Sequence, residues 1–191
     1  MKQKKFKKTP WYKDRGMRNT IILSIFIVFL MGTSALSMYT SDDNDPYKEK
    51  YNGHNFIFNG NYWLNHENNI EIITNPSELK NISINKLNIN SLNYVDKIYY
   101  TFEPDDQLNR AIAEFAREIQ FSARGVRSCP EDNEFCSDLP LKTCKDSDTS
   151  TGIIYLKISE DYNANFENNC LIIEGPSPVK AVNKFILEMK L

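Results

Sequence analysis

Three hydrophobic patterns follow one another along the chain, and each predicts a different kind of structure. The run from Thr20 to Tyr39 contains no charged residue. Between Tyr51 and Thr74, short apolar runs are separated by Asn-rich turns, which is typical of β-strands. From Lys97 onward, strand-like runs alternate with stretches in which apolar residues recur every three or four positions, as in amphipathic helices. We therefore expect an N-terminal apolar segment followed by an α/β domain.

The uncharged segment is predicted to be a transmembrane helix over residues 20–40. A helix of about 20 residues spans ~30 Å, the thickness of the hydrocarbon core of a bilayer. Residues 1–18 contain eight of the 23 Lys and Arg residues but only one of the 25 Asp and Glu residues. Because basic flanks stay on the cytoplasmic side of a membrane, residues 1–19 are expected to form a cytoplasmic tail. The C-terminal domain of this single-pass protein would then lie outside, and topology explains the basic run without a nucleic-acid partner.

Two other interpretations use the same N-terminal residues. Ile21–Met31 has the length of the apolar core of a secretory signal peptide, and Ala35–Ser37 has small residues at the spacing of a cleavage site. Arg15–Gly16 is compatible with the end of a pilin-type leader, although the polar run 41–46 would interrupt the long helix of a pilin. These interpretations predict a released protein and a filament subunit, respectively.

The outer domain is expected over residues 51–191, after a polar linker over residues 41–50. Asn59–Gly60 separates two apolar runs, and this pair favours a two-residue hairpin turn. Such a turn would place Phe56 opposite Trp63. Both faces of this hairpin carry apolar residues, so we expect it to be covered on both sides. We also expect the hairpin to extend or cover the sheet of the C-terminal half.

The C-terminal half predicts one mixed sheet with two packed helices. Lys97–Phe102 has the composition of a strand, and a helix follows Asp105, a residue type that caps helix N-termini. Later strands are expected at residues 152–158 and 170–174, and the last helix begins at Pro178. Strands that alternate with helices indicate a mixed α/β class, either α+β or α/β. Shorter strands are expected at Ile70–Thr74, Val126–Cys129 and Leu139–Thr143.

All four cysteines lie in the predicted outer domain. An even number of cysteines on the oxidising side of a membrane indicates two disulfides, for which three connectivities are possible. We favour Cys129–Cys136, which closes a short acidic loop, and Cys144–Cys170, which ties a strand end to the penultimate strand. No C-x-x-C motif is present, which disfavours zinc binding and thiol redox catalysis. We expect no metal and no other cofactor.

The sequence contains no motif for phosphate binding or for a nucleophilic serine. Glu103, with Asp105 or Asp106, follows a strand end, where α/β folds place their sites. Glycoside hydrolases use a pair of carboxylates as their catalytic residues. Helix capping, however, explains both Asp residues here. Glu174 occupies a second strand end, before a turn. We assign no catalytic residue.

Three smaller features complete the candidate sites. His54 and His66 lie near the ends of the hairpin strands, and with Glu67 they are weak metal-ligand candidates that are explained more simply as polar strand-end residues. Asn81–Ser83 is the one glycosylation sequon. Phe121 points away from the apolar stripe of its helix, so it either tucks under a loop or contacts a partner.

Several short motifs accompany the N-terminal apolar segment. They are Tyr51–Trp63, Pro76–Leu79, Ile98–Pro104, Asp138–Cys144, Asn169–Gly175 and Lys180–Val182. Together they resemble small, uncharacterised single-pass membrane proteins of archaea, over most of residues 20–191. The resemblance implies a membrane helix followed by an extracytoplasmic, Cys-containing α/β domain. Since no activity is established for that group, the resemblance transfers no functional site.

These observations predict a membrane-anchored extracytoplasmic α/β domain with a non-catalytic role, in binding or in envelope structure. Its expected partners are the lipid bilayer, through residues 20–40, and an envelope protein or polymer. One alternative is a carboxylate-dependent envelope hydrolase that uses Glu103, and the other is a pilin-like filament subunit.

Overall fold

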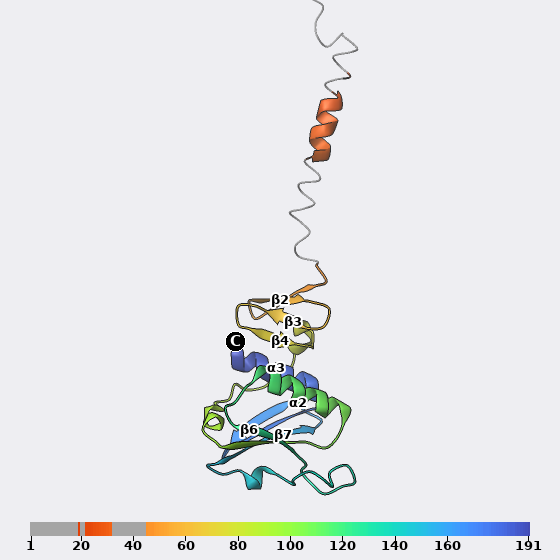
Figure 1. Ribbon diagram of the computed structural model, residues 1–191. Helices are drawn as coiled ribbons and strands as arrows, with labels where there is room; N and C mark the ends of the chain where they lie inside the picture. The colour runs from red at the N-terminus through yellow and green to blue at the C-terminus, as the bar shows by residue number, and fades with distance from the viewer. Residues whose placement is uncertain (1–18, 20–21, 32–44) are drawn as a thin grey trace, which may run out of the picture. The chain divides into compact units, whose positions relative to one another are not determined.

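The computed structural model describes Asn19, residues 22–31 and residues 45–191, which belong to two compact units, Met1–Pro46 and Tyr47–Leu191 (Figure 1). Residues 22–31 are helical, and their apolar side chains are exposed. Among the described residues, no helix combines the length and the hydropathy needed to cross a membrane. The predicted tail up to residue 18, both ends of the predicted membrane helix and both candidate cleavage sites lie outside the described residues, so the anchor stays a prediction.

Sheet A of the second unit is an antiparallel meander with the strand order β1-β2-β3-β4. Its strands are β1 (Lys48–Tyr51), β2 (His54–Phe58), β3 (Trp63–Asn65) and β4 (Ile70–Ile72). β1 includes residues that the sequence pattern assigned to the linker. Tyr51, Phe56 and Ile72 are fully buried, whereas alternate positions are exposed, as expected for an antiparallel sheet that packs through one face.

The predicted register of the β2–β3 hairpin is wrong. Phe58, not Phe56, lies opposite Trp63. The connection is longer than a two-residue turn because the Asn59 side chain accepts a hydrogen bond from the backbone N–H of Tyr62 at 2.8 Å. Asn favours such bonds to nearby backbone. A shift by two residues leaves each side chain on the same face. The expected cover on both faces of the hairpin is wrong, because Phe56 is fully buried whereas Ile57, on the other face, is 44% exposed.

Sheet B has five strands in the order β6-β5-β7-β9-β8. They are β5 (Lys97–Thr101), β6 (Arg124–Ser128), β7 (Thr151–Ile158), β8 (Asn163–Glu167) and β9 (Cys170–Gly175). Four strands run parallel, and only β8 is antiparallel, to β9. The sequence pattern did not predict β8, which reaches β9 through Asn168 and Asn169, both at positive φ as in a type I′ turn. The strand expected at Leu139–Thr143 is reduced to one bridge between Cys129 and Leu141.

Helices α2 (Asp106–Glu118) and α3 (Pro178–Lys190) lie between the two sheets (Figure 1). They pack against each other and on sheet B, and β4 contacts both from the other side. Phe115 and Phe185, whose rings stack at 6.1 Å, share one core with Ile98 and Ile154 of sheet B. The predicted mixed α/β architecture with two packed helices is confirmed. The hairpin region, however, forms a separate sheet that covers the helices, and it does not extend the main sheet.

Candidate functional site

Two disulfides fix the long connection between β6 and β7. Cys129 pairs with Cys136 and Cys144 pairs with Cys170, with Cα–Cα distances of 6.0 and 5.4 Å, which is the connectivity favoured from the sequence. The first bond closes a loop at the end of β6, and the second ties the connection to the start of β9. Helices α2 and α3 cover one face of sheet B, and this connection lies on the other face, where Ile153 is fully buried.

The strand order of sheet B creates a topological switch point between β5 and β7. From β5 the chain passes through α2 to β6 on one side, whereas β7 is followed on the other side by β9. In α/β sheets, ligands bind outside the carboxyl ends of the strands at such a point. A cavity of about 180 Å³ lies at this position. Its lining residues are Glu103, Leu108, Tyr155, Leu156, Lys157 and Ile158.

Helix capping explains how the β5 side of the cavity is built. Pro104 cannot donate a ladder hydrogen bond, so β5 ends before it. The Asp105 carboxylate then accepts hydrogen bonds from the backbone N–H groups of Gln107 and Leu108, at 2.8 and 3.2 Å, and starts α2 as predicted. Leu108 is consequently buried at the first turn of the helix and contributes to the apolar part of the lining. Glu103 stays exposed just before this turn.

Alternation along β7 supplies the other side of the cavity. Ile154 and Leu156 are buried in the core shared with the helices. Side chains alternate between the faces of a strand, so Tyr155 and Lys157 belong to the opposite face. Parallel pairing places Tyr155 beside Thr101, close to the end of β5. This pairing brings β7 next to the strand end that carries Glu103.

Negative charge dominates around the Tyr155 hydroxyl. Burial raises the pKa of Tyr155, and the Glu103 carboxylate raises it further. The Lys157 ammonium acts in the opposite direction, and Glu131, from the connection after β6, adds to the increase. Two carboxylates from different connections are therefore close enough to raise the pKa of the same phenol.

Lys157 offsets this negative charge only in part, because its ammonium is already paired. Its Nζ lies 2.7 Å from the Glu174 carboxylate, which also accepts a hydrogen bond from Asn163 at 3.1 Å. Burial alone would raise the pKa of Glu174, but the hydrogen bonds from Lys157 and Asn163 outweigh it and hold that pKa below its ordinary value. This local network joins β7, β8 and β9.

The carboxylates considered from the sequence are brought together only in part. Glu103 lines the cavity, but Asp105 serves as a helix cap and Glu174 is held by Lys157. Glu103 is thus the one carboxylate among the lining residues, and a hydrolytic acid–base pair requires two. A carboxylate, a phenol, an ammonium and an apolar wall are instead the parts of a binding site.

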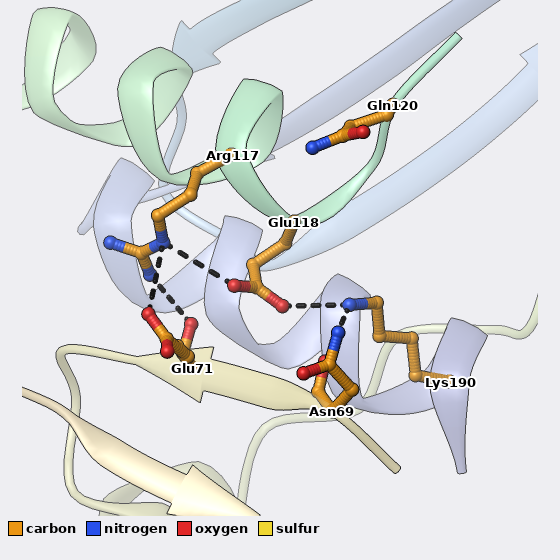
Figure 2. A pocket seen from close by; sticks show the side chains of 6 residues that line it. All are labelled: Asn69, Glu71, Arg117, Glu118, Gln120 and Lys190. Atoms are coloured by element: carbon orange, nitrogen blue, oxygen red, sulfur yellow. Dashed lines mark hydrogen bonds and ion pairs between the residues drawn. The ribbon is translucent and has the colours of Figure 1, made fainter.

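A second hollow, of about 370 Å³, lies where the ends of α2 and α3 meet β4 (Figure 2). Arg117 donates to both carboxylate oxygens of Glu114, at 2.8 and 2.9 Å, and to the backbone carbonyl of Glu71 at 2.6 Å. Its Nε also lies 3.3 Å from Glu118, which pairs with Lys190 at 2.7 Å. Because these charges satisfy one another across three elements, they act as a clamp between sheet A and the helices.

The histidines do not assemble a metal site. His54 lies 3.9 Å from the Glu67 carboxylate and 3.2 Å from the Asn68 amide, and His66 is exposed. In the part of the chain that the structure describes, no three His, Cys, Asp or Glu side chains are grouped to hold a metal.

The predictions for two further candidate residues, Asn81 and Phe121, stay open. Asn81, the sequon residue, is exposed. Phe121 is partly buried, with its ring 6.4 Å from that of Phe115. The position of Phe121 agrees with the interpretation that it tucks inward, and its proposed contact with a partner stays a prediction.

The sequence did not identify Tyr155 and Lys157 as site residues. The alternation of apolar and polar residues along β7 places Tyr155 and Lys157 on one face, but only the pairing of β7 with β5 brings that face next to Glu103.

The second unit is a three-layer α/β domain with a candidate ligand site at the carboxyl edge of its parallel strands. Comparison of the chain with known protein families, with curated proteins and with solved structures gave no match.

Proposed function

We propose that this chain is a membrane-anchored, extracytoplasmic binding domain without catalytic activity. The observation that carries this proposal is that all four cysteines form disulfides within the folded unit, because disulfides persist mainly in oxidising compartments. The uncharged run over residues 20–40 would supply the anchor, and the basic residues before it would set the orientation. The resemblance to archaeal single-pass proteins agrees with the same placement.

The cavity at the strand ends supports a binding role. It combines a switch-point position with an exposed carboxylate on Glu103 and a partly buried phenol on Tyr155. The binding partner would be a protein or polymer of the cell envelope, because the domain would face that compartment.

Thiol labelling in intact cells tests the location. The full chain is treated with a maleimide that cannot cross membranes, with and without prior reduction. We expect no labelled cysteine before reduction and four afterwards. Reactive cysteines without reduction, or labelling that requires lysis, would refute the location. Two variants control the assay: Lys86→Cys, on an exposed residue of the domain, is expected to react in intact cells, whereas Lys5→Cys is expected to react only after lysis.

The intact mass of the same protein tests the anchor. We expect the full chain, with an increase of ~4 Da on reduction of two disulfides. A chain shortened after Gly16 would indicate a filament subunit, and one shortened near Ser37 would indicate a released protein. Either product would replace the anchored domain as the proposed function.

A carboxylate-dependent hydrolase is the second candidate, because Glu103 lies at the cavity. The purified full chain is incubated with a panel of glycans and peptides. Turnover that disappears in Glu103→Gln while the thermal unfolding temperature is unchanged would establish this candidate. An equal rate in wild type and Glu103→Gln, or no turnover at all, would remove it.

A further inference from the structure

The outer face of sheet B is covered unevenly. Near the amino ends of β7 and β9, Ile153 and Cys170 are buried beneath the disulfide-linked connection. Farther along the same strands, the paired residues Tyr155 and Ile172 are partly exposed. Parallel strands are normally buried on both faces. The carboxyl half of this face therefore presents apolar surface that a bound partner would cover.

Further apolar side chains are exposed at the same carboxyl edge of the sheet. Ile158, at the end of β7, is 56% exposed, and Phe135 and Leu141, in the connection after β6, are 70% and 47% exposed. Apolar groups gathered at one edge are characteristic of interaction sites.

Three of the four connections that leave this edge are acidic, and the fourth, residues 176–177 after β9, is uncharged. Residues 102–106, 129–141 and 159–162, which follow β5, β6 and β7, contain nine Asp and Glu residues and no Lys or Arg. Such a one-sided charge distribution attracts a partner of opposite charge and repels polyanions such as nucleic acid. The partner must therefore be basic, and it must also carry apolar groups to cover Tyr155 and Ile172.

The cavity defines how one basic side chain would bind. Among the described residues, no ion pair involves Glu103 or Glu131, whereas the nearby Lys157 is paired with Glu174. An incoming ammonium group would find the Glu103 carboxylate, with Glu131 nearby, and the ring of Tyr155, which attracts cations through its face. The apolar part of the lining, which includes Leu108, suits the methylene groups of a lysine side chain.

From these observations we infer that the carboxyl edge and adjoining outer face of sheet B dock a lysine-rich, partly apolar segment of a protein partner. One lysine ammonium binds Glu103 in the cavity, where the nearby Glu131 carboxylate also attracts it, and further basic residues face the acidic connections. This inference deepens the binding role proposed for the domain, since it names the chemistry of the partner, and it rests on the cavity being the binding site.

Binding of a synthetic peptide tests the docking site. The full chain, in an uncharged detergent, is titrated with a fluorescent peptide that contains eight lysines and four leucines, and anisotropy gives the Kd. We expect saturable binding that weakens about tenfold between 50 and 300 mM salt, because ion pairs at a surface are screened. A peptide in which glutamate replaces every lysine is expected not to bind.

Matched variants locate the binding site. The double variant Glu103→Gln/Glu131→Gln is expected to raise the Kd about tenfold, since two charge-assisted contacts are lost. Glu67→Gln changes the charge of a glutamate with a 73% exposed side chain on the hairpin region and is expected to change the Kd by less than about twofold. Circular dichroism melting verifies that each variant is folded. Equal Kd values for the wild type and the double variant, or no binding at 50 mM salt, would overturn the inference.

Competition with cadaverine identifies the kind of occupant. If cadaverine displaces the peptide at a concentration equal to the peptide's own Kd, the site recognises a small amine and the polypeptide inference is wrong. We expect at least about a hundredfold excess to be required, because one ammonium supplies only part of the contact. None of these outcomes changes the labelling result in cells, so failure of this inference is distinguishable from failure of the proposed location.

Discussion

Replacement of Arg117 by methionine would measure how strongly the charged clamp holds sheet A on the helices. Methionine keeps the unbranched stem of the side chain but removes the guanidinium. The side chains of Glu114 and Glu118 are only 7% and 5% exposed. Glu118 would keep Lys190 as its partner, whereas Glu114 would become a buried carboxylate without the hydrogen bonds that Arg117 donates at 2.8 and 2.9 Å.

The expected loss of stability follows from this unpaired carboxylate. Breaking a buried ion pair by removing one partner costs about 3–5 kcal/mol, so we expect Arg117→Met to lower the free energy of unfolding by about that amount at pH 7. A buried carboxylate can instead take up a proton. The free energy of this protonation becomes more favourable by about 1.4 kcal/mol for each unit by which the pH is lowered. The loss is therefore expected to shrink by up to ~2.7 kcal/mol between pH 7 and pH 5.

Urea unfolding at both pH values, followed through tryptophan fluorescence, measures this loss. Trp63 in β3 places a reporter in the sheet that the clamp holds. Lys180→Met is the matched control, because its ion pair with Glu78 at 2.7 Å is largely exposed and is worth less than about 1 kcal/mol. The double variant Arg117→Met/Glu114→Gln is expected to recover part of the loss, since no charge is left buried. If Arg117→Met costs no more than Lys180→Met at pH 7, the clamp does not hold the layers together.

Three further outcomes are expected. Cys144→Ser/Cys170→Ser should lower the free energy of unfolding, measured in urea, by about 3.5 kcal/mol, because the disulfide closes a loop with a sequence separation of 26 residues and so restricts the unfolded chain. An unchanged urea midpoint would contradict this entropic account. In Gly152→Ala, the new Cβ would lie 2.6 Å from a leucine side chain, so we expect a loss of about 1–3 kcal/mol from overpacking, and an equal or higher melting temperature would show that the core relaxes. The lowered pKa of Glu174 contributes stability above its unfolded pKa of 4.5 that is lost as the pH falls through the folded pKa; Glu174→Gln should therefore lose less stability than the wild type between pH 5 and pH 3, and equal slopes would refute the assignment.

Local signals in the sequence predicted the elements that local chemistry determines. The helix after Asp105 was predictable because a capping side chain precedes a regular apolar stripe, and the structure shows both of its cap hydrogen bonds. The pairing of Cys144 with Cys170 was favoured because it ties the end of an expected strand to the penultimate strand. The bond is present although the first of these strands, Leu139–Thr143, is reduced to one bridge. For the helix, neighbouring residues carry the information, and distant contacts only reinforce it.

Pairing between distant strands was not predictable in the same way. The apolar residues on both faces of the hairpin predicted cover on both sides, but only one face is covered. They also did not indicate whether a sheet or a helix would cover it. The side chain of Asn59 lengthened its turn and shifted the register. Between parallel strands no turn fixes the register at all, so the sequence could not show that Thr101 lies beside Tyr155. The candidate site depends on this contact, which is why only its Glu103 side was identified in advance.

Size alone would favour the hollow at Arg117 over the cavity at the strand ends as the binding site. The pairing of charges favours the opposite choice. A ligand that bound between Glu118 and Lys190 would have to separate a pair at 2.7 Å in which the glutamate is almost fully buried, and the free energy for this would be subtracted from its affinity. A cation at the strand ends would meet the exposed Glu103 carboxylate, for which the described residues provide no ion pair. Binding there separates no existing pair, and so the smaller cavity is the better site.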